Sequence, residues 1–202
     1  MMEFKRMGWD EYFMRIAEVV KLRSHDVNTQ MGCVIVDSKN RIVSTGYNGL
    51  PKGVNDLNWP IERSEKYYIG KSRTQEPRGS EWDEHVFISK TNIDEGRHED
   101  ENKIIEIEKV DEFTKYDVIA HAELNAIVSA GRSVEGCTLY VLAFPCNECA
   151  KAIIGAGIKK VIYGKIQGLS AAWIKPHVIA EDLFREAFIE LIEYKKEDKW
   201  IK

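Results

Sequence analysis

The regular alternation of helical and extended segments between residues 121 and 163 is the feature that most constrains the fold. The pattern predicts helices over residues 121–130 and 146–156 and buried strands over residues 138–142 and 160–163. Gly131 follows the first helix, where glycine commonly ends helices, and Pro145 precedes the second, as suits a helix start. Strands separated by helices in this way are typical of an α/β domain with some parallel strand pairing.

The N-terminal part of the chain continues this pattern with a helix and a hairpin. Apolar residues at helical spacing predict a helix over about residues 9–22. Two apolar runs, residues 32–36 and 41–45, are joined by turn-forming residues and predict a β-hairpin. Near the C-terminus, residues 180–187 suggest a helix, and residues 189–194 fit either a strand or a continuation of that helix.

Residues 62 to 115 do not follow this alternation of apolar helices and strands, because they are polar and rich in charge. Two short runs within them, residues 85–88 and 104–108, have β character, and residues 94–102 are expected to form a solvated loop. We interpret the segment as a surface excursion carried on the core fold. The expectation is therefore one domain over residues 1–202 with an insertion at about 62–115.

Composition narrows the class of protein further. The chain has 202 residues, of which 44% are apolar and 31% charged, as is usual for one soluble globular domain. Neither a secretory signal nor a membrane span is recognisable, so we expect a cytoplasmic protein whose four cysteines are core residues or metal ligands. The net charge of −4 disfavours binding of polymeric nucleic acid but is compatible with a small anionic substrate.

Two short motifs carry the chemistry: His121-Ala122-Glu123 and Pro145-Cys146-Asn147-Glu148-Cys149. This pair is the established signature of zinc-dependent deaminases. Cys146 and Cys149 lie three residues apart in the first helical turn, where the positive helix end favours thiolates. His121, at the start of the neighbouring helix, would supply a third ligand. Three protein ligands leave the fourth tetrahedral position open, which is typical of catalytic zinc.

Glu123 is the predicted catalytic residue, acting as a proton shuttle. Zinc lowers the pKa of a bound water from about 15.7 to about 7. Glu123 would take the proton of that water and deliver it to N3 of a cytosine ring, whose C4 is attacked and releases ammonia. Substitution of Glu123 should then stop the chemistry and leave the metal in place.

The cysteines and histidines allow other interpretations. A lone Cys-x-x-Cys pair is often half of a structural zinc site or a redox pair, but a structural site would call for a second pair. Cys33 and Cys137 lie in or beside apolar strands and are interpreted as core residues. The remaining histidines, at positions 25, 85, 98 and 177, have no cysteine at metal spacing and are interpreted as surface or packing residues.

Five segments of the chain, which include the two motifs, together carry a wider resemblance. They are YFM at 12–14, RSHDVNTQMGCVIVD at 23–37, STGYNGLPKG at 44–53, HAELNAI at 121–127 and GCTLYVLAFPCNECAKAIIGAGIKKVIY at 136–163. Over these segments the chain resembles the deoxycytidylate (dCMP) deaminase family of the cytidine deaminase-like fold. The resemblance covers nearly everything except the excursion and about the last forty residues.

This resemblance implies a three-layer α/β fold, with a mixed five-stranded sheet flanked by helices and zinc between two helix N-termini. It implies conversion of dCMP to dUMP in pyrimidine deoxynucleotide metabolism, a homo-oligomer, and regulation by dCTP and dTTP with Mg²⁺. It also implies a set of substrate-binding residues: Ser24, Asn28, Asn48, Ala122, Pro145 and Trp173. Asn28 could equally be a turn former after Asp26.

Two departures from the family pattern affect the choice of substrate. Familiar members carry Ser-Asp-Lys-Tyr-His after the strand that matches residues 161–163, and the tyrosine lines their pocket. Here residues 164–170 contain neither Tyr nor His, and Trp173 is the predicted replacement. The second departure is the long excursion. The alternatives are a deaminase of dCTP or of a modified nucleotide, a nucleic-acid-editing deaminase, and a non-catalytic zinc protein.

Overall fold

The computed structural model describes residues 6–26, 28–54, 67–73, 84–89, 104–106, 112–113, 115–165 and 171–195. The chain divides into two compact units. The first combines Met1–Gly49 with Ala120–Lys202, and the second is Leu50–Ile119. The second unit contains the excursion expected at about 62–115, with twelve further residues before it and four after it.

The first unit contains the alternating elements. In chain order they are α1 (Trp9–Val20), the 3₁₀ turn η1 (Lys21–Arg23), β1 (Gly32–Val36), β2 (Ile42–Tyr47), α4 (Ala122–Ser129), β7 (Thr138–Val141), α5 (Asn147–Gly155), β8 (Lys160–Tyr163), the 3₁₀ turn η3 (Ala171–Trp173), α6 (Ile174–Glu186) and β9 (Glu190–Glu193). Each helix and strand predicted for this part of the chain is present with ends that differ by one or two residues, except that α6 begins six residues before the helix expected over 180–187. The segment at 189–194, for which two structures were open, forms a strand.

The five strands of this unit form one mixed sheet in the order β2-β1-β7-β8-β9. β1 is antiparallel to both of its neighbours, whereas β7, β8 and β9 run parallel to one another. Parallel neighbours need crossover connections, and α5 and α6 provide them. The expected mixed five-stranded sheet is thus confirmed.

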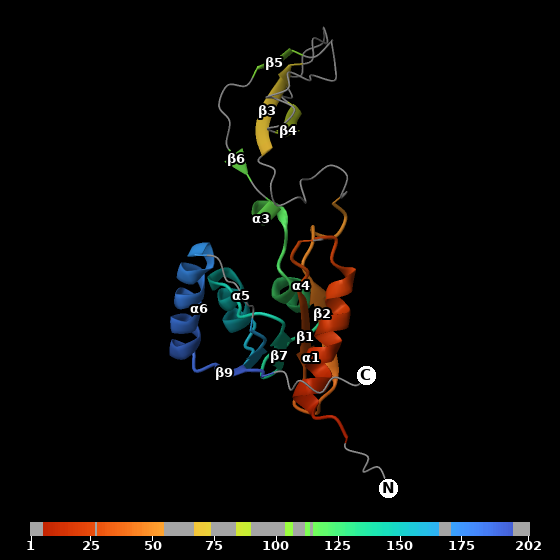
Figure 1. Ribbon diagram of the computed structural model, residues 1–202, viewed down its shortest axis with the longest axis vertical. Coiled ribbons are helices and arrows are strands. Elements are labelled where there is room, and N and C mark those ends of the chain that lie inside the picture. The colour runs from red at the N-terminus through yellow and green to blue at the C-terminus, as the bar shows by residue number, and fades with distance from the viewer. Residues whose placement is uncertain are drawn as a thin grey trace. The chain divides into compact units, whose positions relative to one another are not determined.

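Helices cover both faces of the sheet, giving the expected three layers (Figure 1). On one face α1 packs Phe13 and Ala17 against Val34 of β1 and Tyr140 of β7. On the other face α4, α5 and α6 enclose the larger core. All five residues of β1 are buried, which explains why this strand is apolar throughout rather than alternating.

The second unit is built around β3 (Tyr67–Arg73). This strand pairs antiparallel with β4 (Glu84–Ser89), β5 (Ile104–Glu106) and β6 (Glu112–Phe113), and the helix α3 (Lys115–Val118) follows. The two extended runs predicted here correspond to β4 and β5, while β3 and β6 were not predicted. The loop expected at 94–102 lies outside the described residues.

Among the residues that the structure describes, no helix combines the length and the apolar character needed to cross a membrane.

Candidate metal centre

Two helix N-termini bring three metal-ligating side chains together. His121 is the N-cap residue of α4, Cys146 is the N-cap residue of α5, and Cys149 lies in the first turn of α5. The His121 Nδ1 atom is 3.3 Å from Cys149 Sγ and 3.5 Å from Cys146 Sγ. The three ligand atoms all lie within 4.8 Å of one another. The predicted ligand set is therefore assembled in space.

The spacing of these atoms suits tetrahedral zinc. Zn–S bonds of about 2.3 Å and Zn–N bonds of about 2.0–2.1 Å at tetrahedral angles place a nitrogen and a sulfur about 3.6 Å apart. The two observed N···S distances, 3.3 and 3.5 Å, are close to that value. One imidazole and two thiolates are also a donor set that zinc prefers. A zinc ion held by these three residues would have a fourth position open for a water or substrate.

The electrostatics of the centre favour a thiolate at Cys146. A hydrogen bond from the Cys149 thiol, together with one from the His121 ring, lowers the pKa of Cys146 to about 4. The same contact with Cys146 raises the pKa of His121. Because His121 and Cys146 are the N-cap residues of α4 and α5, the positive ends of both helix dipoles lie at this cluster. The site thus stabilises negative charge before any metal is considered.

Glu123 lies beside these ligands, in the first turn of α4. Its side chain is only 6% exposed, and this burial raises the pKa of its carboxyl group. The Cys149 thiol hydrogen-bonds to it. A buried carboxyl group with a raised pKa holds a proton more readily than a solvated one, which favours a group that must accept a proton and then return it. The environment of Glu123 therefore suits the proton shuttle that the sequence predicts.

The two other cysteines lie in the core, as predicted. Cys33 is fully buried on the face of β1 that the larger core covers, and Cys137 is 5% exposed beside β7. Burial raises the pKa of both thiols, and the nearby Glu123 carboxylate adds to the shift at Cys33. Neither belongs to the metal-ligating group.

Ser24 and Asn48 build the loop that leads into β1. The buried Asn48 amide accepts a hydrogen bond from the Met31 N–H at 2.8 Å and donates one to the Thr29 carbonyl at 2.7 Å. The Ser24 hydroxyl donates to the Asn48 carbonyl at 2.7 Å. Asn28 is exposed, and its N–H donates to the Asp26 carboxylate at 3.0 Å. The structure thus brings Ser24 and Asn48 together and leaves the Asn28 side chain facing solvent.

The other predicted binding residues lie beside the candidate ligands, either in the chain or in space. Ala122 and Pro145 are buried next to His121 and Cys146 in the chain. The indole of Trp173, just before α6, has its ring centroid 6.3 Å from that of His121. Trp173 is thereby brought to the metal centre from a distant part of the sequence.

Sequence reasoning assigned His177 only to the surface or to packing, without a link to this site. Its ring lies 6.0 Å from Trp173 and 5.5 Å from Phe144, between centroids. The signal that could have found it is its position four residues after Trp173, about one helical turn further along the chain. His25 is exposed, and the side chains at 85 and 98 lie outside the described part of the chain.

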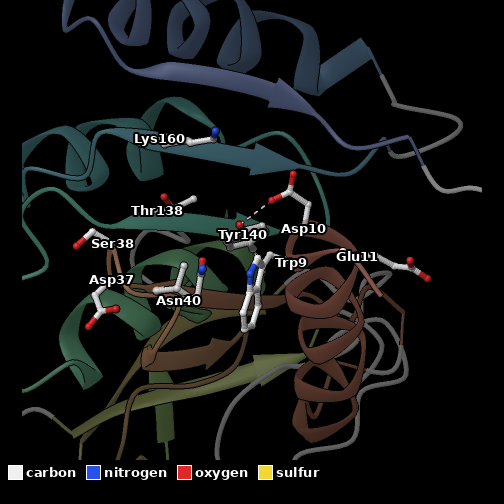
Figure 2. Close-up of a pocket in the computed structure, with 11 residues that line it drawn as sticks. Trp9, Asp10, Glu11, Asp37, Ser38, Asn40, Thr138, Tyr140 and Lys160 are labelled. Carbon is white, nitrogen blue, oxygen red and sulfur yellow. Dashed lines mark hydrogen bonds between the residues drawn. The ribbon is translucent and has the colours of Figure 1, made fainter. Parts of the chain in front are cut away.

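A cavity of about 520 Å³ lies at the end of the sheet that is remote from the metal centre (Figure 2). It is bordered by the start of α1, the end of β1 and the starts of β7 and β8. Its charged groups already have partners in the chain: the Tyr140 hydroxyl donates to Asp10, Arg41 pairs with Asp37, and Lys160 pairs with Glu190. This cavity is separate from the metal centre, which lies near the carboxyl end of β7, where α/β sheets commonly bind ligands.

Comparison with known proteins identifies the group of proteins to which this site belongs. A family model for the cytidine and deoxycytidylate deaminase zinc-binding region matches residues 7–165. The chain belongs to this deaminase family. The matched region contains His121, Glu123 and both ligand cysteines. Membership of a zinc-binding family and the assembled His/Cys/Cys group together support zinc as the metal.

Individual relatives agree with this assignment. The chain is 39% identical over 158 residues to the deoxycytidylate deaminase of Pongo abelii, a match covering 78% of this chain and 65% of that protein. It is 33% identical over 196 residues to the deoxycytidylate deaminase of Enterobacteria phage T4, covering 92% and 89%. The chain therefore spans just under two thirds of the length of the first relative and most of the second.

A solved deaminase shares the fold. The crystal structure of dCMP deaminase from cyanophage S-TIM5 in its apo form superposes with a TM-score of 0.55 at 18% sequence identity. The match covers 94% of this chain and 100% of that structure. At this identity the likeness concerns the fold, which is the mixed five-stranded α/β/α arrangement of the deaminase family.

Proposed function

We propose that the chain catalyses the zinc-dependent hydrolytic deamination of dCMP to dUMP. The observation that carries this proposal is the convergence of His121, Cys146 and Cys149 with the buried carboxyl group of Glu123. A purely structural zinc site needs neither an open fourth position nor an adjacent buried acid. The curated relatives named deoxycytidylate deaminase support the choice of substrate.

In this proposal His121, Cys146 and Cys149 hold the zinc. A zinc ion bound there would lower the pKa of a water molecule. The Glu123 carboxylate accepts a proton from the attacking water and donates it to N3 of the cytosine ring. It then carries the second proton to the departing amino group, so that water and dCMP yield ammonia and dUMP. The raised pKa of Glu123 serves both steps, because the same group must be base and then acid.

The predicted binding residues take different parts in this scheme. Ser24 and Asn48 shape the loop before β1 through their mutual hydrogen bond, and Asn28 presents its exposed side chain to the phosphate or sugar. Ala122 and Pro145 contact the pyrimidine edge beside the ligands. Trp173 provides an aromatic wall for the base, in place of the tyrosine found in familiar members.

Assembly and regulation belong to the same proposal. Leu124 and Val128 of α4 lie one helical turn apart and are exposed, so they offer an apolar stripe to a second copy in a homo-oligomer. dCTP and dTTP, with Mg²⁺, are proposed effectors near Asn48. We further propose that the chain is one functional domain of a cytoplasmic enzyme, with the excursion at about 62–115 as an insertion.

The deciding experiment measures ammonia release and loss of cytosine absorbance with zinc-loaded protein. dCMP, dCTP, deoxycytidine and single-stranded DNA are offered in parallel, and the dCMP arm is repeated with dCTP or dTTP and Mg²⁺. We expect rapid turnover of dCMP alone. Turnover confined to dCTP or to DNA would assign the same zinc chemistry to another substrate, and zinc content without any turnover would leave a binding protein.

The Glu123→Gln variant is the matched control, because it keeps the size of the side chain and removes its proton transfer. We expect turnover to fall by at least about 10²-fold, the usual contribution of general acid–base catalysis, while metal analysis still finds about one zinc per chain. Glu123→Ala should behave alike. A variant that turns over normally would exclude Glu123 as the shuttle, and one that loses zinc would make Glu123 part of the metal site.

A further inference from the structure

A row of aromatic rings leads from the core to the metal centre. The centroid of Phe144 is 5.5 Å from that of His177, with the ring planes at 70°. His177 is 6.0 Å from Trp173, and Trp173 is 6.3 Å from the ligand His121. We refer to Phe144, His177 and Trp173 as the aromatic row. His177 is its central member and has no part in the chemistry proposed above.

The inner end of the row is firmly anchored. Phe144 meets Tyr163 of β8 edge-to-face at 4.8 Å and Phe184 of α6 at 6.2 Å. Phe184 is fully buried. Because Phe184 and His177 lie seven residues apart, they share one face of α6, and both contact Phe144. The position of His177 is therefore set by the same packing that holds α6 on the core.

The outer end of the row is Trp173, which packs against the edge of the larger core. Trp173 is half-buried and precedes α6 at its junction with η3. A tryptophan side chain has two rotatable side-chain bonds, and its neighbours select among the staggered rotamers. The His177 ring, one helical turn further along α6, limits that choice by lying close to one side of the indole at an interplanar angle of 38°.

We propose that His177 is a positioning residue that holds the Trp173 indole beside His121, in the orientation that receives the substrate base. The identity of that substrate rests on the proposed function. The physical gain is preorganisation, because a side chain that is already ordered need not be immobilised when the substrate binds. His177 acts through its ring, as a flat spacer between Phe144 and Trp173, and its nitrogen atoms have no part in this role.

Steady-state kinetics on dCMP tests the role of the ring. We expect His177→Ala to raise KM about 3- to 10-fold, the loss that corresponds to ordering one large side chain, with kcat and zinc content unchanged. His177→Phe should restore KM because it keeps a flat ring at this position. Val178→Ala, which removes an exposed side chain from the next position of α6, is the control and should match the wild type.

A double-mutant cycle with Trp173→Ala tests whether His177 acts through Trp173. If it does, removing His177 from a chain that already lacks the indole should cost nothing more, so the two effects are not additive. Additive losses would overturn the proposal. An unchanged KM in His177→Ala, or a His177→Phe variant whose KM is as high as that of His177→Ala, would also overturn it. So would loss of zinc from His177→Ala.

A third measurement needs no substrate. The difference in fluorescence between the wild type and Trp173→Phe isolates the Trp173 signal, whose quenching by acrylamide reports the exposure of the indole. We expect stronger quenching in His177→Ala and normal quenching in His177→Phe, and unchanged quenching in both would contradict the proposal. Absence of dCMP turnover by the wild type would count against the proposed function alone, since this readout tests the position of Trp173 independently.

Discussion

At the scale of single residues, Asp37 illustrates how one carboxylate can organise a turn. Its Oδ1 atom accepts hydrogen bonds from the N–H groups of Lys39 and Arg41 at 2.9 and 3.0 Å, and Oδ2 accepts one from Arg41 Nε at 2.8 Å. Asn40 has a φ of 57°, which asparagine tolerates better than most residues. These contacts close the β1–β2 hairpin, and those with Arg41 lower the pKa of Asp37 to about 2.

This lowered pKa predicts how the stability of the fold depends on pH. The ordinary pKa is 3.8 and the folded value about 2, so the contribution of Asp37 is complete above pH 3.8 and disappears as the pH falls towards 2. We expect the Asp37→Asn variant to have a lower urea midpoint than the wild type at pH 7. The gap between the two should close as the pH is lowered through that window.

Asp182→Asn serves as the control for this measurement. Asp182 is exposed and pairs with Arg185 on α6, and surface pairs of this kind contribute little to stability. Its urea midpoint should therefore follow that of the wild type at every pH. A gap between Asp37→Asn and the wild type that persists below pH 2 would show that the turn depends on the shape of the side chain rather than on its charge.

Residues whose roles follow from local spacing could be predicted from the sequence, and those whose roles depend on tertiary contacts could not. The ligand set follows from spacing, since Cys146 and Cys149 share a helical turn wherever that helix packs. Asn48 was expected near the substrate, but its hydrogen bonds to Met31 and Thr29 depend on how two segments meet. The contacts of His177 likewise exist only once α6 lies on Phe144.

At the scale of elements, the placement of α4 depends on Gly46. A Cβ atom at this position of β2 would lie 2.2 Å from the Ala122 carbonyl oxygen and 2.3 Å from the Ala126 nitrogen. The Ser44 hydroxyl donates to the Ala126 carbonyl at 2.7 Å. The helix backbone therefore rests directly on β2, and this close approach sets where the first turn of α4 carries His121 and Glu123.

We predict that Gly46→Ala lowers both stability and activity. The added methyl group meets backbone atoms that cannot move aside as a side chain would, and overpacking of this kind costs about 1–3 kcal/mol. The free energy of unfolding in urea should fall by that amount, and kcat/KM on dCMP should fall with it because α4 is displaced. Wild-type behaviour would mean that α4 can shift without disturbing the metal centre.

Gly155→Ala provides the matched control, since it adds the same methyl group to another glycine. Nothing lies within 4 Å of a Cβ atom at Gly155, and the residue is in the last turn of α5. Alanine is the better helix former by about 1 kcal/mol. We expect the variant to be as stable as the wild type or slightly more so, with unchanged activity.

The elements themselves were predictable to different degrees in the two units. In the first unit, helical periodicity and apolar runs agree with each other, and glycines mark the turns, so local and global preferences coincide. Gly131, for example, has the positive φ of 63° expected where a helix ends. In the excursion, Tyr67–Arg73 mixes aromatic, glycine and charged residues, and its role as the central strand comes from partners distant in sequence.

At the scale of the whole first unit, the two ends of the sheet have different tasks. The proposed metal ligands cluster near the carboxyl end of β7, and the cavity of Figure 2 lies near its amino end. There the Tyr140 hydroxyl donates a hydrogen bond to Asp10 at 2.8 Å, which ties the first turn of α1 to the middle of the sheet. Because every charged group named at that end has a partner, we assign it to stability rather than to binding.

Tyr140→Phe tests this division. Removal of the hydroxyl leaves Asp10 exposed to solvent, where water can replace the lost partner, so the cost should be about 0.5–1.5 kcal/mol in the free energy of unfolding. Zinc content, KM and kcat should stay at wild-type values. The control is Tyr12→Phe, which alters a partly exposed tyrosine of α1 and should leave stability, zinc content and kinetics unchanged. The phenylalanine ring preserves the apolar contacts of Tyr140 with Phe13, so the variant changes only the hydrogen bond to Asp10. A rise in KM for Tyr140→Phe would therefore show that the attachment of α1 is coupled through the sheet to the metal centre.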